Sequence, residues 1–371
     1  MAIARNDTSV LGRWWWTVDR WTLAALLTLA LLGLLMTLSA SPSVAERIGA
    51  DPMHFVRKQA ILLIPSLLAM IGVSLMDPRA IRRLALLMLG GSIVLLVATL
   101  FIGAEIKGAT RWVSLGGFTV QPSEFVKPAF AIIAGWMFAS QRMGETMPGY
   151  AFAGLLYLLV VSLLLLQPDV GQAAVVTAIF GVQFFLAGLP MILVIIMVLG
   201  GIGMLVSAYF VFPHVQSRID RFLDPAAGDT FQIDKAREAF MNGGLFGRGP
   251  GEGITKANLP DSHADFVFAV AGEELGLIAC LIIVGIFAFI VLRGFSRVLQ
   301  DNDLFVVVAA TGLLVQFGLQ ALINMASTLS LIPTKGMTLP FLSYGGSSLL
   351  ALGIGMGMLL ALTRKRTGVL S

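Results

Sequence analysis

The sequence predicts an all-α membrane protein, a bundle of ten helices that cross a lipid bilayer. Of its 371 residues, 57% are hydrophobic and only 12% are charged, a charged share about half that of ordinary soluble domains. Long stretches without a charged residue recur along the chain, each near the length that a helix needs to cross a bilayer. No segment has the strand-length alternation of apolar and polar residues that is typical of a transmembrane barrel.

The charge-free stretches define the predicted helices. The stretch 170–217 is too long for one crossing, and Gly188-Leu189-Pro190 interrupts it, so we expect two helices joined by a tight turn. A further helix is expected from Pro122 to near Gln141. The first stretch is longer than the apolar core of a signal peptide, so we expect it to be retained as a helix. The other stretches, including that first one, are 21–45, 59–76, 84–104, 146–168, 275–292, 304–334 and 336–363.

Basic residues predict the orientation of the bundle. Ten crossings place both termini on one face. If that face is cytoplasmic, the cytoplasmic segments carry 12 Lys and Arg, and the external segments other than one long loop carry 6. We therefore predict a single domain over 1–371, with a cytoplasmic tail at 1–20, an external loop at 212–265 between the seventh and eighth helices, and a cytoplasmic tail at 364–371. Polar segments gather outside, so we expect the chemistry there.

Several classes of site are absent from the sequence. The single cysteine, Cys280, allows no intrachain disulfide, and the three histidines have no metal-ligand spacing. No motif for ATP, dinucleotides, zinc proteolysis or a serine nucleophile occurs. The net charge of +4 gives no indication of nucleic-acid binding.

Asp265 is the most prominent acidic residue. It lies in the segment LPDSHADFVF, ten residues before the apolar stretch 275–292. A carboxyl group partly removed from water has a raised pKa, which suits a general base. The alternative is structural: Asp261 or Ser262 caps a helix, and Asp265 lies at the positive end of the helix dipole.

Other charged residues near the outer boundary have two interpretations. Glu124 and Lys127 lie three positions apart on one helix face, where they either neutralise each other or form the polar wall of a cavity. Glu273 and Glu274 lie deep in the predicted membrane region, where acids are usually paired, so we expect a structural pairing role.

Polar residues next to these acids have plain structural interpretations as well. Trp112 has the position of an interfacial tryptophan, and Asp169 that of a helix cap. Gln316, Gln320 and Asn324 fall within one predicted helix, where we expect interhelical hydrogen bonds rather than ligand binding.

The segment PTKGMTLPFLSYGGSS at 333–348 resembles the SEDS (shape, elongation, division, sporulation) family of cell-wall polymerases. GATRW, QPSEFVKP, QPDVG, GGLFGRGPGEG, LPDSHADFVFAVAGEELG and Asn324 resemble further landmarks of that family, in the same order over 20–363. The wording TKGMTLPFLSYGGSS is more similar to the family's division member than to its elongation member.

The resemblance implies a peptidoglycan glycosyltransferase of the bacterial inner membrane that polymerises lipid II, a disaccharide-pentapeptide carried by undecaprenyl pyrophosphate, at the division septum. It implies that Asp265 is the catalytic residue. We expect this carboxylate to take the proton of an acceptor hydroxyl as that oxygen attacks the donor's anomeric carbon, which inverts the centre and expels undecaprenyl pyrophosphate. Substrate contacts are implied for Trp112, Glu124, Lys127, His263 and Ser343.

The leaving pyrophosphate requires positive charge. Candidate cations are Arg111, Lys127, Arg218, Lys256 and Lys335. A divalent cation, Mg or Mn, could share that task.

Two other functions remain open. A lipid II flippase would need alternating access and polar gates on the inner face, and a noncatalytic divisome scaffold that activates a transpeptidase would need no Asp265. The resemblance also implies a class B penicillin-binding transpeptidase and other divisome proteins as partners.

Overall fold

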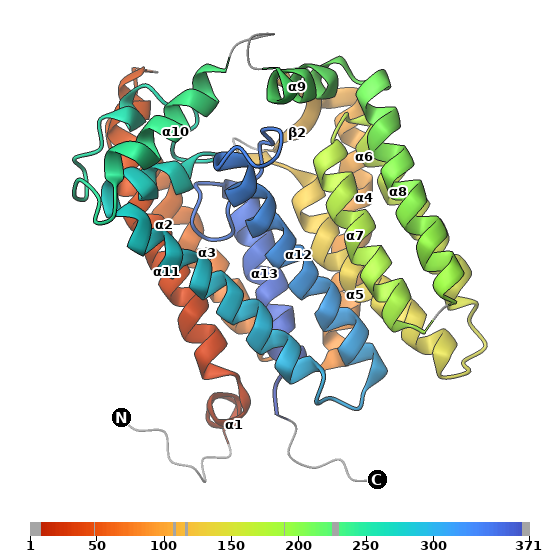
Figure 1. Cartoon of the computed structure of the whole chain (residues 1–371). Helices are drawn as coiled ribbons and strands as arrows, with labels where there is room; N and C mark the ends of the chain where they lie inside the picture. Colours follow the sequence, from red (N-terminus) through yellow and green to blue (C-terminus); the bar gives the residue numbers. More distant parts are fainter. Residues whose placement is uncertain are drawn as a thin grey trace.

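The computed structural model describes residues 9–365 except 48, 107–108, 116–117, 189 and 225–229. Long helices stand side by side in a bundle, and shorter elements cover one end of it (Figure 1). At that covered end lie β2 (Ala109–Leu115), α9 (Pro213–Leu223) and α10 (Phe231–Gly243). Helix α1 (Val10–Thr17), which lies within the predicted N-terminal tail, is at the opposite end. The parts of the predicted tails at 1–8 and 366–371 lie outside the described residues.

Ten helices of 17 or more residues make up the bundle in the described part of the chain. Seven of them are long and apolar enough to cross a membrane, namely α2 (Arg20–Arg47), α3 (His54–Ser74), α4 (Pro78–Ile102), α6 (Gly149–Leu166), α8 (Met191–Val211), α11 (Val267–Val298) and α12 (Leu304–Thr328). Two shorter helices, α7 (Val170–Leu186) and α13 (Gly346–Leu362), are also apolar, and α5 (Pro122–Arg142) carries charged residues. The prediction of a helical membrane protein is therefore confirmed.

Local breaks in the sequence set the ends of several helices. Helix α7 ends at Leu186 and α8 begins at Met191, so the predicted division of this stretch into two helices is confirmed. Leu189 of the predicted turn lies outside the described residues. Pro122 occupies the first position of α5, where its missing N–H costs nothing, and the predicted helix to near Gln141 is confirmed.

The central helices are surrounded by other helices, whereas the outer helices expose apolar side chains on the outside of the bundle. Helix α5 packs against α4, α7 and α12, and α3 packs along α13. Large apolar side chains on the outside of the bundle are exposed, for example Leu87 at 76% and Phe101 at 82%. A surface of this kind is stable in lipid, which is as apolar as leucine.

The predicted helix over 336–363 is wrong in its first part. Helix α13 begins only at Gly346, and the preceding residues of this stretch form loop and turn. The stretch is apolar because it is buried in protein, with Leu339, Phe341 and Leu342 each at most 1% exposed. Non-helical backbone at membrane depth is tolerated where protein encloses it, and an apolar stretch alone does not distinguish lipid from a protein interior.

The segments that were predicted to be external contain regular structure that the all-α prediction missed. Strands β1 (Ala104–Ile106), β2 and β3 (Phe118–Val120) pair antiparallel in that order. The predicted loop at 212–265 contains α9, α10 and the 3-10 turn η2 (Thr255–Ala257). Strands β1 and β3 and the turn η2 have three residues each, fewer than hydrophobic periodicity needs to reveal them.

Helix α11 starts closer to Asp265 than the apolar stretch indicated. It begins at Val267 and its N-cap position is Phe266, so neither Asp261 nor Ser262 occupies the N-cap as predicted. The helix is kinked at Gly276, whose φ of 80° favours glycine.

A clamp of charged and backbone groups fixes the glycine-rich segment beside this kink. The Lys256 ammonium lies 2.5 Å from Glu274 Oε1, and Thr255 donates both its N–H (2.9 Å) and its hydroxyl (2.8 Å) to Glu273. The backbone N–H of Arg248 donates to the carbonyl of Glu273 at 3.0 Å. The predicted pairing role is therefore confirmed for Glu274, whose partner is Lys256, whereas Glu273 has a structural role through hydrogen bonds from neutral groups.

Candidate active site

Asp265 lies in the turn before α11, at the covered end of the bundle. Its backbone carbonyl accepts hydrogen bonds from Asn324 Nδ2 at 2.9 Å and from Thr328 Oγ1 at 3.5 Å, both on α12. Its carboxylate faces the loop before α13, because a Cβ added to Gly336 would stand 2.9 Å from Asp265 Oδ2. Asp265, which is half-buried, therefore lies between α12, which holds its backbone carbonyl, and the loop before α13, which its carboxylate faces.

Ser343 joins the turn that carries Asp265 to the loop before α13. Its hydroxyl donates to the carbonyl of Ala264 at 2.6 Å and accepts from the N–H of Leu339 at 2.8 Å. The N–H of Tyr344 donates to the carbonyl of His263 at 2.9 Å. Ser343 is 2% exposed, so in this conformation its hydroxyl fixes the loops.

His263 lies in an aromatic group. Its ring centroid is 4.3 Å from that of Phe55 and 5.2 Å from that of Tyr344, and its Nδ1 has no hydrogen-bond partner. Burial is the main cause that lowers the pKa of His263, to about 4, so the ring is neutral at pH 7. A neutral, unpaired ring nitrogen can bind a polar group of a ligand but does not supply positive charge.

A second group of charges surrounds Asp169, which precedes α7. Asp169 Oδ1 lies 3.6 Å from Arg111 Nη1 and 3.7 Å from Lys335 Nζ. Arg111 also donates to the backbone carbonyls of Gln167, at 3.4 Å, and Pro168. Asp169 is 2% exposed, and its Oδ2 has no hydrogen-bond partner.

Arg218 connects this group to Asp265. It lies on α9, and its Nη1 donates to the carbonyl of Thr334 at 3.0 Å. Burial lowers the pKa of Arg218, and the positive charge of Arg111 lowers it further, whereas the negative charges of Asp265 and Asp169 oppose this shift. Arg111 and Lys335 therefore flank Asp169, and Arg218 lies close enough to both Asp169 and Asp265 for their charges to act on it.

The pKa of the Lys335 ammonium is lowered. Burial lowers its pKa to about 8, Arg111 and Arg218 contribute in the same direction, and the Asp169 carboxylate opposes them. The charge of this ammonium depends on its neighbours, as is common for groups in binding sites.

Glu124 and Lys127 form a buried ion pair beneath the loop. Lys127 Nζ lies 2.9 Å from Glu124 Oε2 and donates to Gln320 Oε1, also at 2.9 Å. Gln172 donates to Glu124 Oε1 at 2.6 Å, and Gln320 donates to the carbonyl of Thr338 at 3.0 Å. Lys127 is fully buried, so in this conformation its ammonium supports the loop through Gln320.

The remaining predicted residues lie apart from the carboxylates or are engaged elsewhere. Lys256 is directed to Glu274, Ser39 Oγ (3.0 Å) and the carbonyl of Gly251 (2.8 Å), so its charge is neutralised within the clamp. Trp112 is half-buried in β2, where its Cα is paired with that of Ala104 in β1.

Sequence reasoning missed the residues that position the charges. Gln320 forms the predicted interhelical bond, since it accepts from Lys127 of α5, and it also donates to the loop before α13. Asn324 donates only to loop carbonyls, those of Asp265 and Met337. Asp169 was expected only as a cap and is also an ion-pair partner. The signal was available in the QPDVGQ segment, where an acid and two glutamines stand together between apolar stretches.

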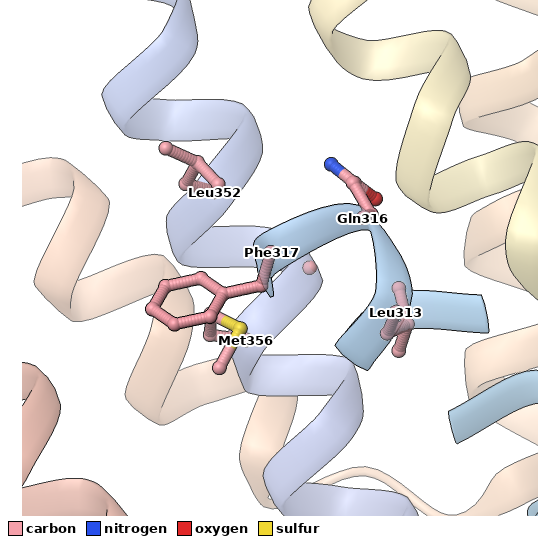
Figure 2. Close-up of a pocket in the computed structure, with 6 residues that line it drawn as sticks. Leu313, Gln316, Phe317, Leu352 and Met356 are labelled. Carbon is pink, nitrogen blue, oxygen red and sulfur yellow. The ribbon is translucent and has the colours of Figure 1, made fainter. Parts of the chain in front are cut away.

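A cation site of three or more His, Cys, Asp or Glu side chains does not occur among the described residues. A small cavity lies between α12 and α13, apart from the charged groups (Figure 2). It is lined by Leu313, Gln316, Phe317, Leu352, Gly355 and Met356. Gln316 Oε1 is buried there without a hydrogen-bond partner. This cavity is apolar and too small for a lipid substrate.

Known proteins match this chain over nearly all its length. Residues 20–368 match the cell cycle protein family of FtsW, RodA and SpoVE. A probable peptidoglycan glycosyltransferase FtsW from Caulobacter vibrioides is 51% identical over 370 residues, which cover 99% of this chain and 94% of that protein. The protein of the same description from Escherichia coli is 32% identical over 351 residues, covering 92% and 85%.

Solved structures are similar as well. The rod shape determining protein RodA of Thermus thermophilus has a TM-score of 0.70 at 28% identity, covering 94% of this chain and 97% of that one. A chain from a study of a peptidoglycan synthase complex that coordinates polymerization and crosslinking has a TM-score of 0.76 at 28% identity, covering 93% and 97%.

Proposed function

Because the chain belongs to the cell cycle protein family of FtsW, RodA and SpoVE, we propose that it is a peptidoglycan glycosyltransferase of the division type, which polymerises lipid II into glycan strands. The observation that carries the proposed mechanism is the group of cations Arg111, Lys335 and Arg218, of which Arg218 lies within electrostatic range of the Asp265 carboxylate. A glycosyl transfer from a lipid pyrophosphate needs a base for the acceptor and positive charge for the leaving group.

Asp265 is the proposed general base. It accepts the proton of the acceptor sugar's 4-hydroxyl as the oxygen attacks the anomeric carbon of the donor. The new glycosidic bond forms as the bond to undecaprenyl pyrophosphate breaks, and the anomeric centre is inverted. Because Asn324 and Ser343 hold the backbone on either side of the carboxylate, the base is fixed before substrate arrives.

Arg111, Arg218 and Lys335 are the proposed pyrophosphate ligands. They stabilise the negative charge that develops as the leaving group departs. Trp112 and His263 remain proposed substrate contacts. Glu124, Lys127 and Ser343 act by positioning the loops, and Lys256 is not a proposed ligand because Glu274 neutralises it.

The proposed topology has ten crossings, made by the seven long apolar helices together with α5, α7 and α13. Both termini are then cytoplasmic, and the covered end with Asp265 faces outward from the inner membrane. This arrangement suits a substrate whose reactive sugar lies at the outer headgroup boundary. A penicillin-binding transpeptidase is the proposed partner, since a similar chain comes from a peptidoglycan synthase complex, and the division septum is the proposed location.

The Asp265→Asn variant tests the proposal. Asn has the size of Asp but cannot take a proton, so purified variant in detergent with lipid II should form no glycan, while wild-type protein forms strands that electrophoresis resolves. Thermal unfolding of the variant should match that of wild type. Near-normal polymerisation by well-folded variant would remove the base assignment. Wild-type protein that moves lipid II across vesicles without forming glycan would favour the flippase, and inactivity in both assays would favour the scaffold.

A further inference from the structure

We propose that Asp169 is a resident counter-anion of the pyrophosphate subsite, which the substrate's diphosphate must displace from the cations and which thereby limits how tightly the product is held. This inference rests on the proposed function and adds a positioning residue to it. Asp169 is not itself a catalytic residue.

The contacts of Asp169 are long for a buried ion pair. Its Oδ1 lies 3.6 Å from Arg111 and 3.7 Å from Lys335, beyond the 2.7–3.2 Å typical of a good N–H···O bond. Its cap bond from the N–H of Gln172 is also long, at 3.5 Å. Its Oδ2 has no hydrogen-bond partner although the residue is 2% exposed. Buried carboxylates normally form short bonds at both oxygens, so Asp169 neutralises the cations without binding them firmly.

The surroundings of Asp169 are built for an anion larger than one carboxylate. Helix α7, of 17 residues, begins directly after it and directs the positive end of its dipole there. The cations Arg111, Arg218 and Lys335 outnumber Asp169 and Asp265, the carboxylates that act on them, so positive charge is in excess here.

Lys335 packs closely against the first turn of α7. A Cβ on Gly171 would stand 1.8 Å from Lys335 Cε and 2.5 Å from its Nζ. Only glycine at this position lets the ammonium approach the first turn of α7. A cation at the positive end of a helix is unfavourable by itself, and it becomes favourable when an anion lies between the two.

A diphosphate meets these requirements better than Asp169 does. It offers several oxygens at short distance to Arg111, Lys335 and the N–H groups of α7. Once it is bound, the Asp169 carboxylate is a like charge beside it and weakens the binding. The same repulsion favours release of the pyrophosphate product after each transfer.

Inorganic pyrophosphate is the probe for this inference. Full-length protein in phosphatidylcholine nanodiscs is titrated calorimetrically at pH 6.5, where Lys335 is protonated. Asp169→Asn should bind pyrophosphate at least tenfold more tightly than wild type, and Lys335→Gln should bind it more weakly. In the polymerisation assay Asp169→Asn should have a lower KM for lipid II without a higher kcat.

The asparagine variant separates charge from capping, because Asn caps a helix as well as Asp does. Asp77→Asn is the matched control, the same change at the N-cap of α4, where Asp77 accepts from the N–H of Ala80 at 2.7 Å. It should leave pyrophosphate binding unchanged.

Unchanged or weaker pyrophosphate binding by Asp169→Asn would overturn the inference. So would competition by phosphatidylglycerol, since that result would assign the subsite to a bulk phospholipid headgroup. If the proposed function itself is wrong, the wild-type protein will form no glycan. If only this inference is wrong, wild type will polymerise and the Asp169 variant will bind pyrophosphate as wild type does.

Discussion

Because Gly171 lies so close to Lys335, a substitution at Gly171 can displace the Lys335 ammonium while Lys335 itself is kept. In Gly171→Ala the new Cβ would meet Lys335, to which its three nearest atoms all belong. Because these atoms end a flexible side chain, the ammonium moves rather than the backbone. The helix is not weakened, since Ala has a higher helix propensity than Gly.

The expected loss follows from Coulomb's law. Moving one charge from about 4 to about 6 Å from a phosphate costs about 1.4 kcal/mol at an effective dielectric constant of about 20. That cost corresponds to about a tenfold lower kcat/KM for lipid II. Thermal unfolding of the variant should be unchanged or shifted slightly upward.

The assay is polymerisation of lipid II at several concentrations, with Gly154→Ala as the matched control. Gly154 lies in α6, and a Cβ there meets no atom within 4 Å, so its variant should have wild-type kinetics. If Lys335→Gln lowers kcat/KM and Gly171→Ala does not, the displacement argument is refuted. If neither variant changes it, Lys335 is not a pyrophosphate ligand.

Two further predictions concern the same end of the bundle. Since burial and the charges of Arg111 and Arg218 lower the pKa of Lys335 to about 8 against the opposing Asp169, its positive charge is lost as pH rises through that value. KM for lipid II should therefore rise above pH 8 in wild type but not in Lys335→Arg, and an equal rise in both would exclude Lys335 as the cause. The double variant Glu124→Gln, Lys127→Met should polymerise at least tenfold more slowly, about 1.4 kcal/mol of barrier, because Gln320 loses its support for the loop. A wild-type rate would leave the buried pair a purely structural role.

The helices could be predicted from the sequence because lipid tolerates few charges. Charge-free stretches and the breaks at Pro122 and Gly188-Leu189-Pro190 located ten helices. The same rule failed at 336–345, where an apolar segment is enclosed by protein. Apolarity reports the absence of water and does not report which apolar medium replaces it.

For the candidate site, the sequence allowed individual residues to be predicted but not how they group in space. Charged residues are rare in such a chain, so Asp265, Arg111 and Lys335 were conspicuous. Their grouping was not, because it depends on how α7, α9 and the loop before α13 meet in space. Lys256 had the same appearance in the sequence, yet the clamp on α11 neutralises it.

The polar residues of this end have two distinct tasks, and this explains which of them the sequence revealed. Amides and hydroxyls on α12 and in the loops, such as Asn324, Gln320 and Ser343, donate to backbone carbonyls of the loops that surround Asp265. The bonds that these groups donate to those carbonyls are 2.6–3.0 Å long, so they fix geometry. Asp169, in contrast, lies 3.6 and 3.7 Å from its cations, and its Oδ2 has no hydrogen bond. Burying such incompletely bonded charge is costly unless a ligand completes the bonds. We therefore expect substitutions of the amides to change positioning and those of the charges to change affinity for the diphosphate.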